Sequence, residues 1–196
     1  MAAGTIALII VLIVVVLAII GTAASIATRR RRLRDRFGPE YDRVAAELSS
    51  RRLAEAELTD RKHRVASYEL RPLSDEACEK YSARWSQVQE QFVETPSEAV
   101  GEAQALIEAV MRERGYPAAG YQQTLEDLSV EHAPVLEHYR AAHAAYEKAA
   151  ADGAGTGAST EELREAMISY RELFSQLLGR APAARQRELD EADARD

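Results

Sequence analysis

The strongest constraint in the sequence is an uncharged, apolar stretch close to its N-terminus. This stretch covers residues 5–27, which are 23 residues dominated by Ile, Leu and Val. As an α-helix with a rise of about 1.5 Å per residue it would be about 35 Å long, slightly more than the roughly 30 Å hydrocarbon core of a bilayer. The sequence therefore predicts a transmembrane helix over residues 5–27.

A cleaved signal peptide is the alternative interpretation of the same stretch. Such a peptide carries positive charge before its apolar region, which is about 7–15 residues long, and small residues at the cleavage site. Here the apolar region is longer and the positive charge follows it, although Ala24, Ser25 and Ala27 resemble a cleavage site. We expect an uncleaved anchor, with secretion after cleavage as the alternative.

A basic segment over residues 28–36 follows the apolar stretch directly. It contains six arginines and one aspartate, whereas no charged side chain precedes the stretch. Short positively charged flanks stay on the cytoplasmic side, so the C-terminal part is expected in the cytoplasm. The same side chains are candidates for binding anionic lipid head groups. These arginines are Arg29, Arg30, Arg31, Arg32, Arg34 and Arg36.

The rest of the chain is acidic, with 19 basic and 31 acidic residues between Phe37 and Asp196. Neutralising nucleic-acid phosphates requires a basic face, so a nucleic-acid partner is not expected. A disulfide framework is excluded because Cys78 is the only cysteine.

The fold class predicted beyond the membrane is all-α, because no segment alternates like a strand for long. Residues 37–70 are rich in Ala, Glu, Arg and Leu, and Pro39 lies where the first turn of a helix would begin. This pattern favours one long stalk helix or half of a coiled coil. Its apolar stripe is thin, and its heptads are irregular. Residues 71–178 are predicted to form a small helical bundle, and residues 179–196 a disordered polar tail.

Apolar residues recur at helical spacing in three segments within residues 71–178, which predicts three buried helix faces. These faces extend from Tyr81 to Phe92, from Val100 to Met111 and from Leu163 to Leu177.

Three helix starts within the same region have recognisable signals. Ser74 is a plausible N-cap, and the sequence from Thr95 to Glu98 combines capping-box spacing with a first-turn proline. The sequence from Ser159 to Glu162 has the same capping-box spacing. A glycine-rich loop is expected at residues 152–158, and a short helix at 122–128.

No catalytic, cofactor-binding or metal-binding residue can be assigned from the sequence, and an enzyme is the less favoured class. His132, His138 and His143 are separated by six and five residues, whereas ligands on one helix face are three or four apart. Cys78 is flanked by glutamates, which would raise the pKa of a thiol rather than activate it.

Aromatic residues on the helix faces are the remaining candidates for a site. Trp85, Tyr116, Tyr139 and His143 either pack in the core with polar atoms at its rim, which we favour, or line a groove for a partner helix.

Several short motifs occur along the chain, namely Phe37-Gly38-Pro39-Glu40-Tyr41, Leu70-Arg71-Pro72, Arg84-Trp85, Phe92-Val93, Arg114-Gly115-Tyr116-Pro117, Leu128-Ser129-Val130-Glu131-His132 and Tyr139-Arg140-Ala141-Ala142-His143. Together they resemble a group of actinobacterial single-pass membrane or secreted proteins. The similarity covers residues 5–178, with Ala133 standing where that group often has proline directly after the histidine. The resemblance implies a membrane or secreted location and transfers no catalytic residue.

Together these patterns favour a membrane-anchored module that binds or positions another protein at the cytoplasmic face. A structural or stress-related envelope protein without a specific ligand is the alternative. An exposed apolar groove would favour the module.

Overall fold

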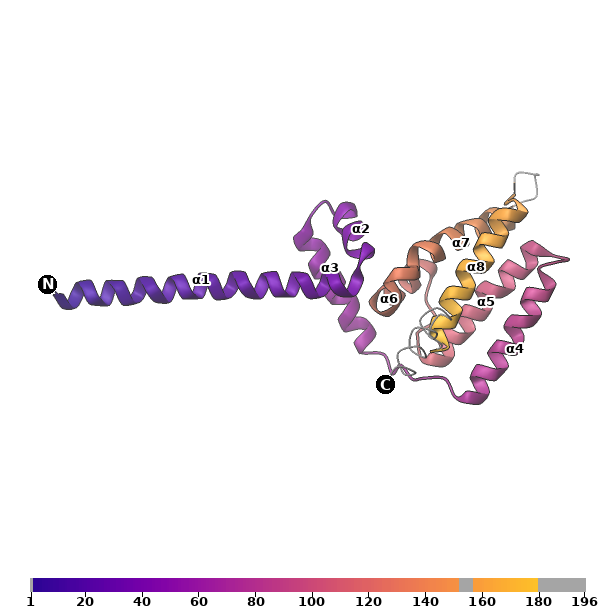
Figure 1. Cartoon of the computed structure of the whole chain (residues 1–196), viewed down its shortest axis with the longest axis horizontal. Helices are drawn as coiled ribbons and strands as arrows, with labels where there is room; N and C mark the ends of the chain where they lie inside the picture. Colours follow the sequence, from indigo (N-terminus) through magenta and orange to yellow (C-terminus); the bar gives the residue numbers. More distant parts are fainter. Residues whose placement is uncertain (1, 152–156, 180–196) are drawn as a thin grey trace, which may run out of the picture. The chain divides into compact units, whose positions relative to one another are not determined.

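The computed structural model describes the backbone of residues 2–151 and 157–179, and side chains from Leu12 onward within them. Every regular element in this part of the chain is a helix, which confirms the predicted all-α class (Figure 1). The chain divides into two compact units, Met1–Asp60 and Arg61–Asp196. The helices are α1 (Ala2–Phe37), α2 (Pro39–Glu47), α3 (Arg51–Ala66), α4 (Asp75–Gln91), α5 (Pro96–Arg114), α6 (Tyr121–His132), the 3₁₀ helix η1 (Ala133–Val135), α7 (Leu136–Ala150) and α8 (Thr160–Leu177).

Helix α1 contains the apolar stretch and continues without a break through the arginines. Its segment Leu12–Phe37 is long and apolar enough to cross a membrane, with a mean hydropathy of 2.1 over its most apolar 18 residues. A signal sequence near the N-terminus has the same properties. The hydroxyls of Thr22, Ser25 and Thr28 donate hydrogen bonds to carbonyls of their own helix. Their polar groups are therefore satisfied within the helix, as a lipid environment requires.

The predicted single helix over residues 37–70 is not confirmed, because two breaks divide this region. The first is Gly38, whose φ of 47° is in the left-handed region that glycine adopts without steric cost. The second separates α2 from α3 near Ser49, a non-glycine residue with a φ of 49°. Helices α2 and α3 therefore form a hairpin, and the predicted coiled coil is not confirmed either.

Buried apolar side chains join the end of α1 to this hairpin. Leu33 and Phe37 are four residues apart and so lie on one face of α1. Tyr41 and Val44 of α2 and Leu58 of α3 are also buried. The region predicted as an extended stalk thus has a small core of its own.

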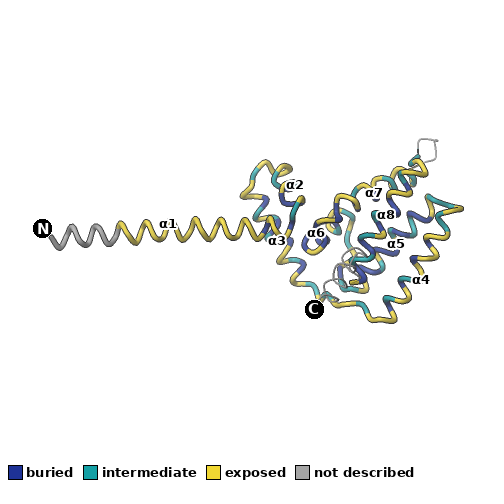
Figure 2. Tube along the Cα trace, viewed as in Figure 1, coloured by how far each residue is buried: buried dark blue, intermediate teal, exposed yellow. Residues whose placement is uncertain are grey.

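The second unit contains α4 to α8 and the main hydrophobic core, seen as dark blue segments in Figure 2. The predicted apolar stripes of α4, α5 and α8 are buried, as helical periodicity implies. Helix α5 packs between α4 and α8, and α7 packs along α8. Helices α4 to α8 therefore share one core.

The capping predictions had mixed outcomes. The Ser74 hydroxyl accepts a hydrogen bond from the Ala77 N–H, and Ser159 and Glu162 form a complete capping box. Thr95 makes no side-chain cap hydrogen bond, so the box predicted at the start of α5 is wrong, whereas Pro96 does begin this helix. Helix α6 is longer than the predicted residues 122–128. Most of the predicted loop 152–158 and all but Gly179 of the predicted tail lie outside the described residues.

Candidate functional site

The aromatic residues predicted as candidates lie mostly inside the second unit. Trp85 is only 6% exposed and stacks on Phe174, with the ring centroids 4.7 Å apart. Tyr116 and Tyr139 are also buried. Their packing agrees with the core interpretation and leaves them no open groove to line.

His143 is half-buried and belongs to a small polar network at the edge of the same core. Its ring stacks on Tyr121, and its Nδ1 lies 3.0 Å from Oε1 of Gln104. The same Gln104 oxygen accepts a hydrogen bond of 2.8 Å from the Tyr170 hydroxyl. Burial lowers the pKa of His143 and raises that of Tyr170. The neutral form of each ring is thus favoured, which suits a structural network.

The three neighbouring histidines do not converge on a common point. His132 Nδ1 lies 3.0 Å from Gln176, His138 Nδ1 lies 3.4 Å from Glu172, and His143 bonds to Gln104. Across the described residues, no group of three His, Cys, Asp or Glu side chains is placed to hold a metal ion.

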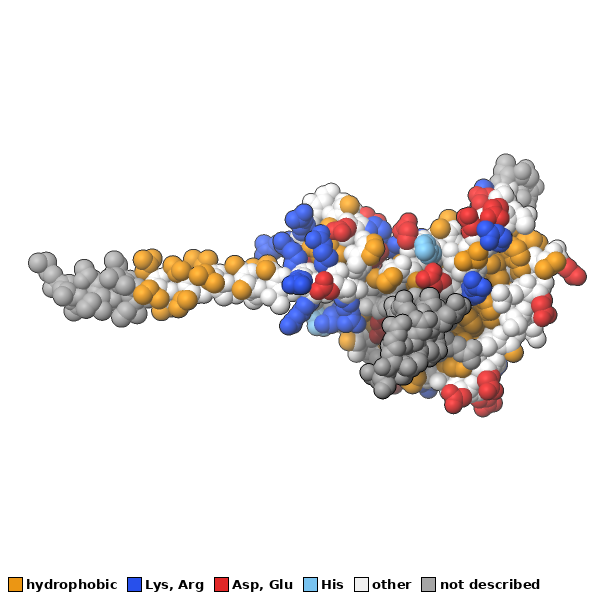
Figure 3. Space-filling view, viewed as in Figure 1, with side chains coloured by type: hydrophobic (Ala, Val, Ile, Leu, Met, Phe, Trp, Pro, Cys, Tyr) orange, Lys and Arg blue, Asp and Glu red, His pale blue; other side chains and the backbone are white. Residues whose placement is uncertain are grey.

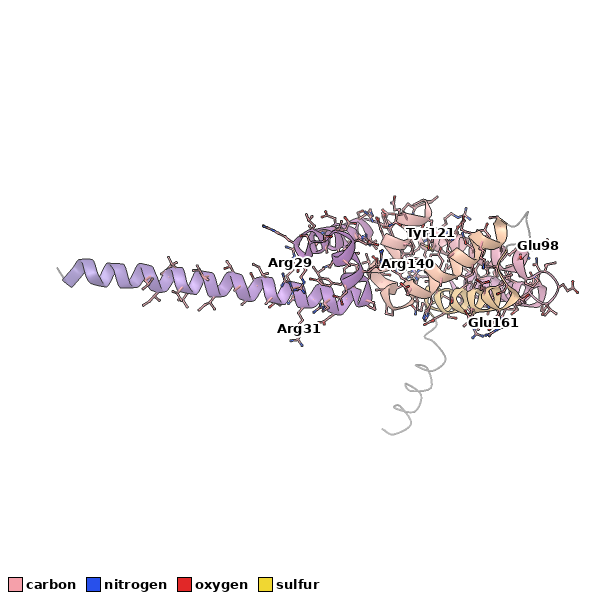
Figure 4. The ribbon with its side chains drawn as sticks, turned by 90° about the horizontal axis from the view of Figure 1, so that it is seen from above. Arg29, Arg31, Glu98, Tyr121, Arg140 and Glu161 are labelled. Carbon is pink, nitrogen blue, oxygen red and sulfur yellow. The ribbon has the colours of Figure 1, made fainter. Side chains whose placement is uncertain are left out.

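All six juxtamembrane arginines are exposed, and the contacts of five of them differ. Arg29, Arg30 and Arg34 bond to Thr59, Glu55 and Asp42 of the α2–α3 hairpin at 2.6 to 3.0 Å. Arg31 instead pairs within α1, with its Nε 3.9 Å from Asp35, and Arg32 is exposed to solvent. Arg31 has a side chain that is 85% exposed, and it lies on the opposite side of α1 from Arg29 (Figure 4).

A groove between α7 and α8 has a volume of about 660 Å³. Its α7 wall is built from alanines, including Ala141, Ala144 and Ala145. Its α8 wall contributes Ala166 and Ile168, and the Ile168 side chain is 44% exposed. Hydrophobic side chains over this part of the second unit are visible in Figure 3. Because alanine side chains are short, they leave an open, apolar floor.

Charged residues close the two ends of this α7–α8 groove. At one end Lys148 Nζ donates hydrogen bonds to both carboxylate oxygens of Glu162, at 2.9 and 3.1 Å. At the other end His138 faces Glu172. Hydrogen bonds from Lys148 and from the Ser159 backbone lower the pKa of Glu162 to about 2, so this carboxylate stays ionised. With Glu165 also lining the groove, its rim is acidic.

The groove residues were not identified from the sequence. The run from Ala141 to Ala145 favours helix whether these alanines are buried or exposed, so it gives no sign of a cavity. Ile168 was the available signal, because it lies outside the apolar stripe of α8 and between acidic residues at helical spacing, Glu165 and Glu172.

Two smaller hollows of about 190 and 200 Å³ lie on the second unit, and the first of them shares Ile168 with the groove. One borders Phe92 and Met167, and the other the turn at Pro117. Neither approaches the volume of the α7–α8 groove, which remains the best candidate site.

No family model matches the chain, and neither a curated protein nor a solved structure is significantly similar to it.

Proposed function

We propose that this protein is a membrane-anchored helical module whose α7–α8 groove binds an amphipathic helix of a partner protein. The observation that carries the proposal is the open alanine floor with the half-exposed Ile168 on its α8 wall. Helix-binding grooves accept the apolar side chains of a partner helix. An exposed isoleucine beside an apolar floor offers such side chains a surface to pack against.

The dimensions of the groove suit a short helical segment. Its α7 wall extends from His138 to Lys148, which corresponds to about 15 Å at about 1.5 Å rise per residue. A partner helix of about three turns has this length. Its contacting residues must be small or slender, because the cavity of about 660 Å³ is shared along the whole length.

The charge of the groove rim indicates which residues should border the apolar face of the partner helix. Glu162, Glu165 and Glu172 outnumber Lys148, the one lysine in the lining. Complementary charges steer association and disfavour partners with acidic flanks. The proposed occupant is therefore a helix with an apolar face bordered by Lys or Arg.

The anchor places this interaction at a membrane surface. The six arginines follow the apolar helix, so we propose that the second unit is cytoplasmic. The resemblance to actinobacterial single-pass membrane or secreted proteins supports a membrane or secreted location and adds no activity.

Site-specific photocrosslinking in intact membranes tests the proposed groove. A photoreactive amino acid at Ile168 should capture one partner, and the crosslinked peptide should be a helical segment with basic flanks. The Ala141→Trp variant should abolish capture, because Ala141 lines the groove and is exposed. Ala150→Trp is the matched control on the same helix, since Ala150 is exposed but does not line the groove.

A photoreactive residue at Val93, which is 83% exposed and outside the groove, controls for non-specific capture. Equal capture from both positions, or capture that Ala141→Trp leaves unchanged, would contradict the proposal. Absence of any capture at Ile168 would favour the alternative, an envelope protein that has no specific ligand.

A further inference from the structure

The first unit carries more exposed arginines than those that directly follow the apolar stretch. Arg51 and Arg52 begin α3 and are exposed, as are Arg31 and Arg32 of α1. Lys and Arg side chains gather where the apolar part of α1 meets the α2–α3 hairpin (Figure 3). We call Arg31, Arg32, Arg51 and Arg52 the basic collar.

Polar contacts fix the α2–α3 hairpin at a defined position along α1. Glu55 of α3 pairs with Arg30 at 2.6 Å, and Thr59, one turn further, accepts a hydrogen bond from Arg29 at 3.0 Å. The Tyr41 hydroxyl of α2 donates to the same Glu55 carboxylate at 2.9 Å. Burial of Glu55 works against its ionisation, but its bonds to Arg30 and Tyr41 prevail, so the pKa of Glu55 is lowered and the pair stays ionised.

This attachment point lies at the end of the apolar stretch. Arg29 and Arg30 follow the last apolar residues of α1 with only Thr28 between, so a bilayer that contains residues 5–27 would place them among the head groups. Helix α3 runs across α1 at this level rather than along it (Figure 1). Arg51 and Arg52 lie about one turn before Glu55 on α3 and therefore stay near the same depth.

We infer that the α2–α3 hairpin is a lipid-binding surface, on which the basic collar holds the head groups of anionic phospholipids. The inference rests on the proposed membrane anchor and names the lipid class that the anchored chain selects. Arg29, Arg30 and Arg34 have a different part, because their bonds to Thr59, Glu55 and Asp42 hold the hairpin on α1. A basic residue near an anionic surface contributes about 1 kcal/mol, which is about a fivefold preference at one head-group site.

Electron paramagnetic resonance with spin-labelled lipids tests this assignment on the full chain. The protein is reconstituted into phosphatidylcholine vesicles that contain trace spin-labelled phosphatidylglycerol or phosphatidylcholine. The motionally restricted fraction gives the association constant of each lipid with the protein. The wild-type chain should prefer phosphatidylglycerol, and high salt should weaken this preference.

Two double variants test which arginines cause the preference for phosphatidylglycerol. Arg51→Gln with Arg52→Gln, and separately Arg31→Gln with Arg32→Gln, should each lower the phosphatidylglycerol preference. Arg112→Gln with Arg171→Gln is the matched control, because these exposed arginines belong to α5 and α8 of the second unit. Circular dichroism confirms that each variant keeps its helical content.

The possible outcomes distinguish a failure of the basic-collar inference from a failure of the proposed membrane anchor. An absence of motionally restricted lipid of either kind would mean that the chain does not insert, which overturns the proposed anchor. Insertion with an unchanged preference in the Arg51/Arg52 variant would overturn the hairpin as a lipid-binding surface. A loss only in the Arg31/Arg32 variant would likewise restrict lipid binding to α1.

Discussion

Trp85 illustrates how a single side chain joins two helices of the main core. It is buried on α4 and stacks on Phe174 of α8 with an interplanar angle of 20°. Among the described residues, no atom accepts a hydrogen bond from its Nε1. Its contribution to stability therefore comes from apolar contact and ring stacking.

Truncating Trp85 should consequently destabilise the second unit strongly. We expect Trp85→Ala to lower the free energy of unfolding by about 3–5 kcal/mol, because it leaves a large cavity. Trp85→Phe should cost much less, since it retains an aromatic ring and loses no hydrogen bond. Denaturant titration of the full chain in detergent measures both, with Val93→Ala at an exposed position as the control. A small effect of Trp85→Ala would place this side chain outside the core.

His132 makes stability sensitive to pH. Its ring is buried, its Nδ1 lies 3.0 Å from Gln176, and its Nε2 has no partner among the described atoms. Burial lowers the pKa of His132, and nearby Arg114 lowers it further, whereas Gln176 and Glu131 act in the opposite direction. Protonation would place a charge in the interior that Gln176 and Glu131 only partly compensate.

The sign of the effect follows from the lowered pKa. The unfolded chain takes up a proton near pH 6.5, before the folded chain does, so stability is lost as the pH falls below about 6.5. The melting temperature of the full chain in detergent should therefore fall between pH 7.5 and 5.5, and less so in His132→Gln. Val93→Ala, at an exposed and non-titratable position, should leave the pH profile unchanged. A profile that His132→Gln does not flatten would contradict this role.

At the scale of helices, the sequence patterns were informative wherever periodicity alone determines burial. The stripes from Val100 to Met111 and from Leu163 to Leu177 are buried as predicted. The division between α2 and α3 could not be predicted, because Leu48, Ser49 and Ser50 include neither Gly nor Pro. There the core formed by Leu33, Phe37 and Tyr41 competes with helix propensity and prevails.

The candidate groove was unpredictable for a different reason. A cavity forms where no side chain fills the space between α7 and α8. Alanine favours a helix equally whether its side chain is packed or lines an open wall, so it does not reveal such a space. Similarly, the threonine before Pro96 matches a capping box, but its φ of −132° and ψ of 73° accompany no side-chain cap hydrogen bond. The spacing of Thr, Pro and Glu identified where the helix starts. The cap hydrogen bond also depends on the backbone conformation of the threonine, which the spacing does not determine.

Gly115 ends α5 in a conformation that other residues resist. Its φ is 99°, and a Cβ at this position would lie 2.6 Å from the Glu69 backbone oxygen. We expect Gly115→Ala to destabilise the second unit by more than about 1 kcal/mol, because the left-handed strain adds to a clash with backbone. Gly120→Ala is the matched control, since its φ is −67° and nothing lies within 4 Å of an added Cβ. Thermal unfolding that gives the same result for both variants would contradict the argument.

On the scale of the whole molecule, one continuous helix carries an exposed apolar segment and an end that packs against other helices. The described part of the apolar stretch, from Leu12 onward, is fully exposed, whereas Leu33 and Phe37 are buried. Exposure of so many Ile, Leu and Val side chains to water would be unfavourable at about 25 cal/mol per Å². A bilayer removes that cost, which is the physical basis for the proposed anchor.

The position of the arginines makes the proposed orientation testable. A fluorescent reporter fused after residue 196 should be active in the cytoplasm, and an alkaline phosphatase fused there should be inactive, because the six arginines resist translocation. Replacing Arg29, Arg30, Arg31 and Arg32 by Ser, together with Ala2→Arg and Ala3→Arg, should shift the two reporters towards the opposite pattern. The mass of the purified protein provides an independent check. An N-terminus near residue 28 would show cleavage of a signal peptide, and an active phosphatase on the unaltered chain would reverse the orientation while leaving the span in place.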